Sequence, residues 1–161
     1  MKWIKLTVLS SLSLALLLSI TSCEKNAEKK KITDYQKSGI VLSAAQETPA
    51  NNSPALGTMD VFYTKETRIL SYTVKWSGLT SAPILMHIHG LAPRGYAAGV
   101  VQTILSAANP TLFPATGSYS GTLLVDGVVV KEADLLNGFY YMNIHTTANP
   151  GGEIRGQITF Q

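Results

Sequence analysis

Arg68-Ile69-Leu70-Ser71-Tyr72-Thr73-Val74-Lys75-Trp76 is the stretch that decides the fold. Its larger residues alternate with polar ones, so that Leu70, Tyr72, Val74 and Trp76 form one set. Successive side chains of a β-strand point to opposite faces, and the pattern therefore predicts a strand with one buried face. Such a strand is typical of antiparallel sheets, in which one face packs on the core and the other meets water.

Similar short segments recur along the chain and are separated by turn residues such as Ser77-Gly78 and Asp126-Gly127. The predicted strands cover residues 39–44, 58–64, 68–76, 84–90, 100–105, 117–125, 139–146 and 152–161, and one helix-like piece runs from Lys131 to Asn137, closed by Gly138. This pattern predicts an all-β fold, an antiparallel Greek-key β-sandwich or barrel of about seven to nine short strands with at most one short helix.

The N-terminus has the composition of an export signal. Lys2 and Lys5 precede an apolar run from Leu6 to Ile20, and small residues lead to Cys23. A positive start, an apolar segment of this length and small residues before the cleavage point are typical of a secretory signal peptide, and the run is too short for a permanent membrane span. We therefore expect residues 1–22 to be removed on export.

Ile20-Thr21-Ser22-Cys23 resembles the lipobox of bacterial lipoproteins, in which the cysteine is acylated and becomes the first residue of the mature chain. Cys23 is the only cysteine, so an internal disulfide is excluded. The alternative is an ordinary cleavage site beside an incidental cysteine. The resemblance implies that Cys23 carries acyl chains such as palmitate and anchors an exported domain to a membrane. With Glu24 next in the chain, it implies the outer membrane, on its periplasmic or surface face.

The basic character of the chain, with a formal net charge of +3, belongs to its N-terminal part. From residue 40 onward six lysines and arginines stand against seven aspartates and glutamates, which leaves one net negative charge. A basic nucleic-acid-binding surface is therefore not expected. Residues 23–38 are polar and charged, as in a flexible tether, and residues 39–161 are expected to form the folded domain.

All three histidines lie in two segments, Met86-His87-Ile88-His89-Gly90 and Asn143 to Gln157. On a strand, His87 and His89 would point to the same side, about 6 to 7 Å apart. His145 would complete a set of three nitrogens if its strand lies alongside. Three neutral imidazoles suit copper or zinc and leave a fourth position for water or substrate. The alternative is that the histidines hydrogen-bond loops and hold the ends of the sheet together.

Two acids are candidates for the same site. Glu47 and Glu153 are predicted either to supply a fourth ligand or to orient an imidazole as acceptors. Pairing with Arg155 or Arg94 explains Glu153 equally and is the interpretation that we favour, and Glu47 would then fix its loop. Asn143 completes the polar candidates. No catalytic residue is predicted, because the sequence has neither a nucleophile elbow nor a phosphate-binding loop.

The chain from about Ile40 to Gln161 resembles CHRD domains, the module named from chordin and also found alone in bacterial secreted proteins. The resemblance rests on four pieces of sequence: Leu42-Ser43-Ala44-Ala45-Gln46-Glu47-Thr48-Pro49, Gly57, His87-Ile88-His89-Gly90, and the segment from His145 to Gln157. The family is defined by sequence and has no generally assigned biochemical role, so the resemblance implies no particular activity.

A second, more distant resemblance is to copper/zinc superoxide dismutase, a Greek-key β-barrel. Gly78-Leu79 leads to the pair His87 and His89, His145 lies on a late strand, and Arg155 follows two glycines. The sequence lacks a fourth histidine to bridge two metals, a zinc-loop ligand set and a cysteine pair. The resemblance therefore implies a relationship of fold and not a dismutase of that type.

Three functions follow as expectations. The leading one is a membrane-anchored extracytoplasmic binding module, non-catalytic, whose partner is an unidentified protein or glycan. The second is a mononuclear copper or zinc protein with a three-histidine site and dismutase-like redox activity. The third is a structural envelope or adhesion domain. The sequence leaves enzymatic activity open and favours its absence.

Overall fold

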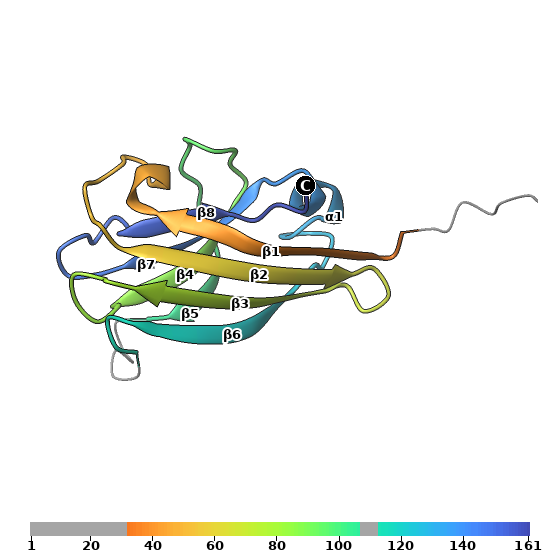
Figure 1. The fold of residues 1–161 in the computed structure, drawn as a ribbon. Coiled ribbons are helices and arrows are strands. Elements are labelled where there is room, and N and C mark those ends of the chain that lie inside the picture. Colours follow the sequence, from red (N-terminus) through yellow and green to blue (C-terminus); the bar gives the residue numbers. More distant parts are fainter. Residues whose placement is uncertain (1–31, 107–112) are drawn as a thin grey trace, which may run out of the picture. The chain divides into compact units, whose positions relative to one another are not determined.

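The computed structural model describes residues 32–106 and 113–161 of the chain. The predicted signal peptide, Cys23 and the tether up to Lys31 lie outside the described residues. In the described part, eight strands, one 3-10 turn and one short helix follow one another (Figure 1). Their bounds are β1 (Asp34–Ser43), η1 (Ala44–Gln46), β2 (Leu56–Thr64), β3 (Ile69–Ser77), β4 (Leu85–Gly90), β5 (Val100–Leu105), β6 (Gly117–Leu124), α1 (Glu132–Leu136), β7 (Tyr140–His145) and β8 (Ile154–Gln157). No helix in these ranges is long and apolar enough to cross a membrane.

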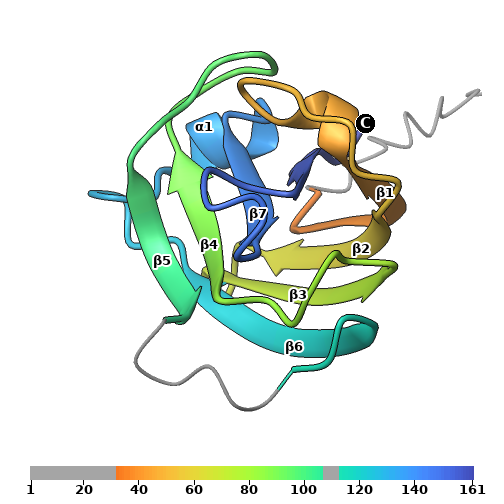
Figure 2. The same ribbon diagram turned by 90° about the vertical axis from the view of Figure 1, so that its left-hand side faces the viewer.

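The strands form a single antiparallel sheet in the order β5-β4-β7-β8-β1-β2-β3-β6. Seen from one end, the sheet curls until its two edge strands, β5 and β6, approach each other (Figure 2). The result is a nearly closed barrel. The prediction of an all-β antiparallel fold with one short helix is confirmed.

The core fills the inside of the barrel with the side chains that the alternation predicts. Leu70, Tyr72, Val74 and Trp76 of β3 are all buried. The same alternation in β2 buries Met59, Val61 and Tyr63, and in β4 it buries Met86 and Ile88. Each fully buried side chain of this size contributes about 1.5 to 3 kcal/mol of hydrophobic stabilisation, so the inward set accounts for the fold.

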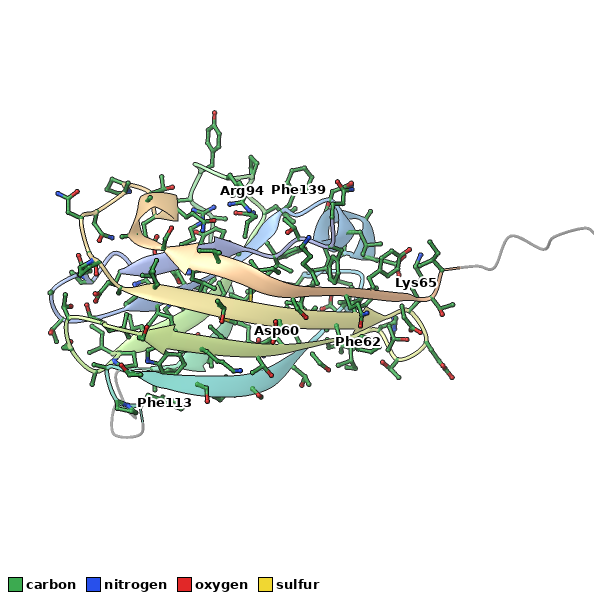
Figure 3. The ribbon with its side chains drawn as sticks, viewed as in Figure 1. Asp60, Phe62, Lys65, Arg94, Phe113 and Phe139 are labelled. Atoms are coloured by element: carbon green, nitrogen blue, oxygen red, sulfur yellow. The ribbon has the colours of Figure 1, made fainter. Side chains whose placement is uncertain are left out.

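The first strand begins at Asp34, whereas the sequence predicts a start at Gly39. Residues 34–37 pair with residues 61–64 of β2, and the register shifts between Lys37 and Ile40. At this irregularity Gly39 adopts a left-handed conformation with φ of 70°. Its N–H donates to Oδ1 of Asp60, which is labelled in Figure 3, over 2.8 Å. The sheet therefore extends into the segment predicted as tether.

The last strand is shorter than the predicted one, which runs from residue 152 to residue 161. β8 ends at Gln157, and one further hydrogen bond of 2.9 Å joins the N–H of Ile158 to the carbonyl of Tyr140. Its partner β7 begins at Tyr140, so no ladder is available beyond that point. The helix lies as predicted, and the chain turns after it at Gly138, whose φ is 77°.

A glutamine side chain spans the seam between the two edge strands. Gln102 of β5 donates from Nε2 to the carbonyl of Thr122 on β6 over 2.8 Å. Its Oε1 accepts from the hydroxyl of Tyr72 on β3 over 3.0 Å. These bonds take the place of a ladder between β5 and β6, and they satisfy a tyrosine hydroxyl that belongs to a buried residue.

Replacing Gln102 by alanine should lower the free energy of unfolding by about 1 to 3 kcal/mol, because the hydroxyl of Tyr72 loses its acceptor. Urea denaturation measures the loss. Thr103→Ala, at an exposed neighbour on the same strand, is the control and should change the free energy by less than about 0.5 kcal/mol. Equal effects of the two substitutions would show that the seam is not held by Gln102.

Candidate metal centre

The histidines lie on the outer face of the barrel, where strands β4, β7 and β8 run side by side. The register places His87 opposite Asn143, and Asn143 opposite Arg155, so these three side chains form a row across the strands. Their neighbours along the strands, such as Met86 and Ile144, belong to the core. Side chains alternate between faces, and the row therefore points away from the core.

This outer face is nevertheless buried, because loops cover it. Every residue of β7 is buried, on both faces of the strand. Residues 91–99 cover one side, where Ala98 contacts His89 and the hydroxyl of Tyr141. Residues 146–153 cover another, where Pro150 contacts His145. The face is thus a polar layer enclosed between the sheet and its loops.

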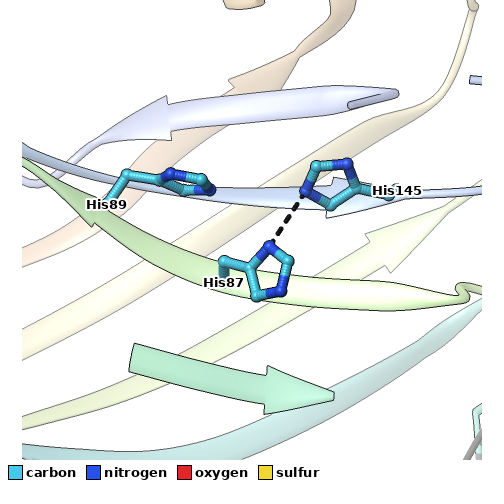
Figure 4. Close-up of side chains that lie close together, drawn as sticks. All are labelled: His87, His89 and His145. Atoms are coloured by element: carbon cyan, nitrogen blue, oxygen red, sulfur yellow. Dashed lines mark hydrogen bonds between the residues drawn. The ribbon is translucent and has the colours of Figure 1, made fainter. Parts of the chain in front are cut away.

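The three imidazoles cluster as Figure 4 shows. Nδ1 of His87 lies 3.3 Å from Nε2 of His145. One ring nitrogen from each of His87, His89 and His145 can be chosen so that all lie within 4.8 Å of one another. Among the described residues, this group contains the three histidines and neither Glu47 nor Glu153. Pairing of β4 with β7 brings these residues together from 58 positions apart in the sequence.

Two of the rings are held in one tautomer by backbone carbonyls. Nδ1 of His89 lies 2.9 Å from the carbonyl of Ala98, and Nδ1 of His145 lies 2.9 Å from the carbonyl of Pro150. A carbonyl oxygen only accepts, so each Nδ1 carries the hydrogen. In a neutral ring the other nitrogen, Nε2, then bears a lone pair. Both Nε2 atoms face Asn143, each 3.0 Å from its Oδ1.

The environment favours uncharged rings. Burial lowers the pKa of His87 to about 4, and the neighbouring His145 and His89 add to the shift. Burial also lowers the pKa of His145, against the opposing effect of its hydrogen bond to Pro150. These two imidazoles are therefore neutral at pH 7, which is the form that binds a metal ion.

Glu47 is a neighbour of both Asn143 and Arg155. Burial raises its pKa to about 7, although the charge of Arg155 and hydrogen bonds from the Thr48 backbone and the Asn143 side chain oppose the shift. Its Oε1 is buried and has no hydrogen-bond partner among the described residues. The carboxyl group packs against Gly152, where φ is 127° and a Cβ atom would collide with it. Glycine is therefore required at position 152.

Glu153 is completely buried, and hydroxyl groups satisfy it. Ser53 and Thr80 donate to its two oxygens over 2.6 and 2.7 Å, the Thr80 N–H donates over 2.9 Å, and the Thr146 hydroxyl also donates. Burial opposes ionisation, but these hydrogen bonds outweigh it and lower the pKa. No ion pair with Arg155 or Arg94 is formed in the described ranges. Hydroxyl groups therefore stabilise the Glu153 carboxylate, in place of the predicted pairing with Arg155 or Arg94.

Arg155 binds the loop above the sheet. Its guanidinium donates to the carbonyls of Tyr96 and Pro93 over 2.9 and 3.4 Å, and it lies 3.4 Å from the ring centre of Tyr141. Arg94, the other predicted arginine, lies on the exposed surface and donates to Gln46 (Figure 3). Only Arg155 therefore belongs to the buried layer.

The sequence of the described barrel matches one protein family. A family model for the CHRD domain matches residues 39–158. The chain belongs to the CHRD domain family. No curated protein and no solved structure matches the chain. The match covers all of the strands that carry the polar layer, so this layer belongs to the CHRD domain itself.

Two members of the layer in this CHRD domain are not among the residues predicted from sequence. Tyr141 stacks on His89, with 4.8 Å between ring centres and an angle of 3°. Gln157 accepts from Arg155 over 3.1 Å and donates to the carbonyls of Ala92 and Gly138. Both could have been predicted from the two-residue period of a strand. Tyr141 shares a face with Asn143 and His145, and Gln157 shares a face with Arg155. No sequence signal identifies the hydroxyl partners of Glu153.

Replacing Glu47 by glutamine should change how stability depends on pH. The pKa of Glu47 is raised from 4.5 to about 7 in the folded protein, so the folded state holds its proton more tightly between these values. Its contribution to stability therefore falls as the pH rises from about 4.5 to about 7. The Glu47→Gln variant should gain up to about 3 kcal/mol over the wild type across this window.

Urea denaturation of the two proteins, with chelator present, between pH 4.5 and pH 8 measures the difference. Glu66→Gln, at an exposed acid in the turn after β2, is the matched control and should give the wild-type pH profile. Parallel profiles for wild type and Glu47→Gln would contradict the assignment of a raised pKa to Glu47.

Proposed function

We propose that this CHRD domain binds one copper or zinc ion through His87, His89 and His145. The observation that carries the proposal is the pair of Nδ1 hydrogen bonds to the carbonyls of Ala98 and Pro150. Metal-ligating histidines commonly donate their second ring N–H to a carbonyl, which fixes the tautomer and the ring orientation. Here the same bonds leave two lone pairs directed at a common point inside the layer.

The spacing of the nitrogens supports this proposal. In a tetrahedral site with metal–nitrogen bonds of about 2.0 to 2.1 Å, neighbouring ligand atoms are about 3.3 Å apart. His87 and His145 have this separation. The whole set lies within 4.8 Å, so the widest spacing has to shorten as the rings turn toward the ion. Nitrogen donors of this type suit copper and zinc better than magnesium or calcium.

We further propose that the domain is the exported part of a lipid-anchored protein. The apolar N-terminal run and the lipobox-like residues before Cys23 support this placement. The outer membrane is the proposed location, on the resemblance of Cys23-Glu24 to exported lipoproteins. The CHRD domain would then act as a tethered, non-catalytic binding module whose bound species is a metal ion.

The metal proposal predicts near-stoichiometric copper or zinc on residues 24–161, purified without a histidine tag and dialysed against each ion. A His87→Ala/His89→Ala variant should lose the metal, because two of the three ligands are gone. Elemental analysis measures the content, and circular dichroism verifies that both proteins are folded. The Thr103→Ala variant should bind as the wild type does. Folded wild-type protein without metal would contradict the proposal.

The anchor proposal predicts that the full chain, expressed in a bacterium that processes lipoproteins, is found in the membrane fraction. Cys23→Ser should release it, because the serine hydroxyl does not accept the thioether-linked lipid. Labelling with a palmitate analogue and fractionation provide two independent measurements. Unlabelled wild-type chain in the soluble fraction would argue for an ordinary cleavage site.

A further inference from the structure

The geometry points to a fourth protein ligand: we infer that Oδ1 of Asn143 completes the coordination of the metal ion. This inference rests on the proposed function and deepens it, because the identity of the fourth ligand decides what the site can do. Asn143 lies on β7 together with His145, and β7 runs between β4, which carries His87 and His89, and β8, which carries Arg155. It is buried and offers its amide directly to two imidazoles.

The hydrogens of the imidazoles point away from Oδ1 of Asn143. The Nδ1 atoms of His89 and His145 use their hydrogens on backbone carbonyls. Their Nε2 atoms therefore present lone pairs, and Oδ1 of Asn143 lies 3.0 Å from both. An amide oxygen has only lone pairs as well. Nε2 of His145 accepts a hydrogen bond from Nδ1 of His87, but no hydrogen lies between Oδ1 and either Nε2 atom. These lone pairs repel one another, and a cation among them would turn the repulsion into binding.

The orientation of the amide follows from its other contact. The Asn143 side chain lowers the pKa of Glu47 against the larger effect of burial, and so favours the charged carboxylate. An amide presents its nitrogen to a carboxylate, and Oδ1 of Asn143 correspondingly lies 3.0 Å from Nε2 of His89 and of His145. Turning the amide over would give the imidazoles a donor, but it would place the amide oxygen against an oxygen of Glu47 whenever this carboxyl group is ionised.

The spacing of the four donor atoms fits a tetrahedral ion. The separations of Oδ1 from the two Nε2 atoms are 3.0 Å each, and the separation of His87 from His145 is 3.3 Å. The edges of a tetrahedron around copper or zinc are about 3.3 Å. Three of its six edges are thus already close to their final length. The donor set is three nitrogens and one oxygen, all from the protein.

A four-ligand set has a chemical consequence. Catalytic zinc and related sites keep one position for water or substrate, whereas sites with four protein ligands are closed. With Asn143 bound, the ion has no exchangeable position, so small anions do not reach it. The site then holds or stores a metal ion and does not activate a substrate.

Cobalt(II) is the probe for the test, because its visible absorption distinguishes four-coordinate ions from those with more ligands. Residues 24–161 are used as wild type, Asn143→Ala and Asn143→Asp. Asn51→Ala is the matched control, because Asn51 donates to the carbonyls of Gly152 and Glu153 over 3.1 Å each. It removes a neighbouring amide that contacts no imidazole. Affinity is measured by competition with a chelator, and azide is then added to each cobalt-loaded protein.

We expect Asn143→Ala to weaken cobalt binding at least tenfold and to acquire an azide-dependent spectrum that the wild type lacks. Asn143→Asp should retain the wild-type affinity, since it supplies an oxygen at the same place, and Asn51→Ala should behave as the wild type. Unchanged or tighter binding by Asn143→Ala would overturn the inference and show that the amide competes with the metal. An azide response in the wild type would also overturn it. Absence of cobalt from the wild type would instead overturn the metal site itself.

Discussion

The buried guanidinium of Arg155 is the interaction on which the outer layer of this protein depends. It is 1% exposed, and it joins β8 to the loop of residues 91–99 through the carbonyls of Pro93 and Tyr96. Burial lowers its pKa, and Tyr141 and Glu47 offset this effect. A buried cation is tolerated only when hydrogen bonds and opposing charge surround it. The guanidinium thus holds the loop of residues 91–99 over the sheet, and Ala98 of this loop covers His89.

Most of the fold could be predicted from alternation alone. The pattern in residues 68–76 gives β3 to within one residue at each end, and the interiors of the other strands follow in the same way. Alternation also places His87 and His89 on one side, and it identifies Asn143 and His145 as a polar set on their own strand. What alternation does not contain is the order of the strands. That β4 lies beside β7 is a property of the strand order of the whole sheet.

The errors in the prediction share a physical cause. The polarity of residues 34–38 is typical of a tether, yet backbone hydrogen bonds to β2 do not depend on side-chain polarity. Glu153 is expected to form an ion pair with an arginine, yet three uncharged hydroxyl groups from separate loops donate hydrogen bonds to it. In both cases the partners come from segments that are distant in the sequence, β2 in the first and three loops in the second. A single sequence carries little information about such contacts, because they follow no fixed period.

The early start of β1 sets where the described chain enters the barrel. Asp34 begins the strand, and Ser43 at its other end pairs with Arg155 in the row that contains Asn143. Nine steps along a strand cover about 30 Å. The described chain therefore enters the sheet at one end of β1, and the row that contains Asn143 lies at the other end of that strand.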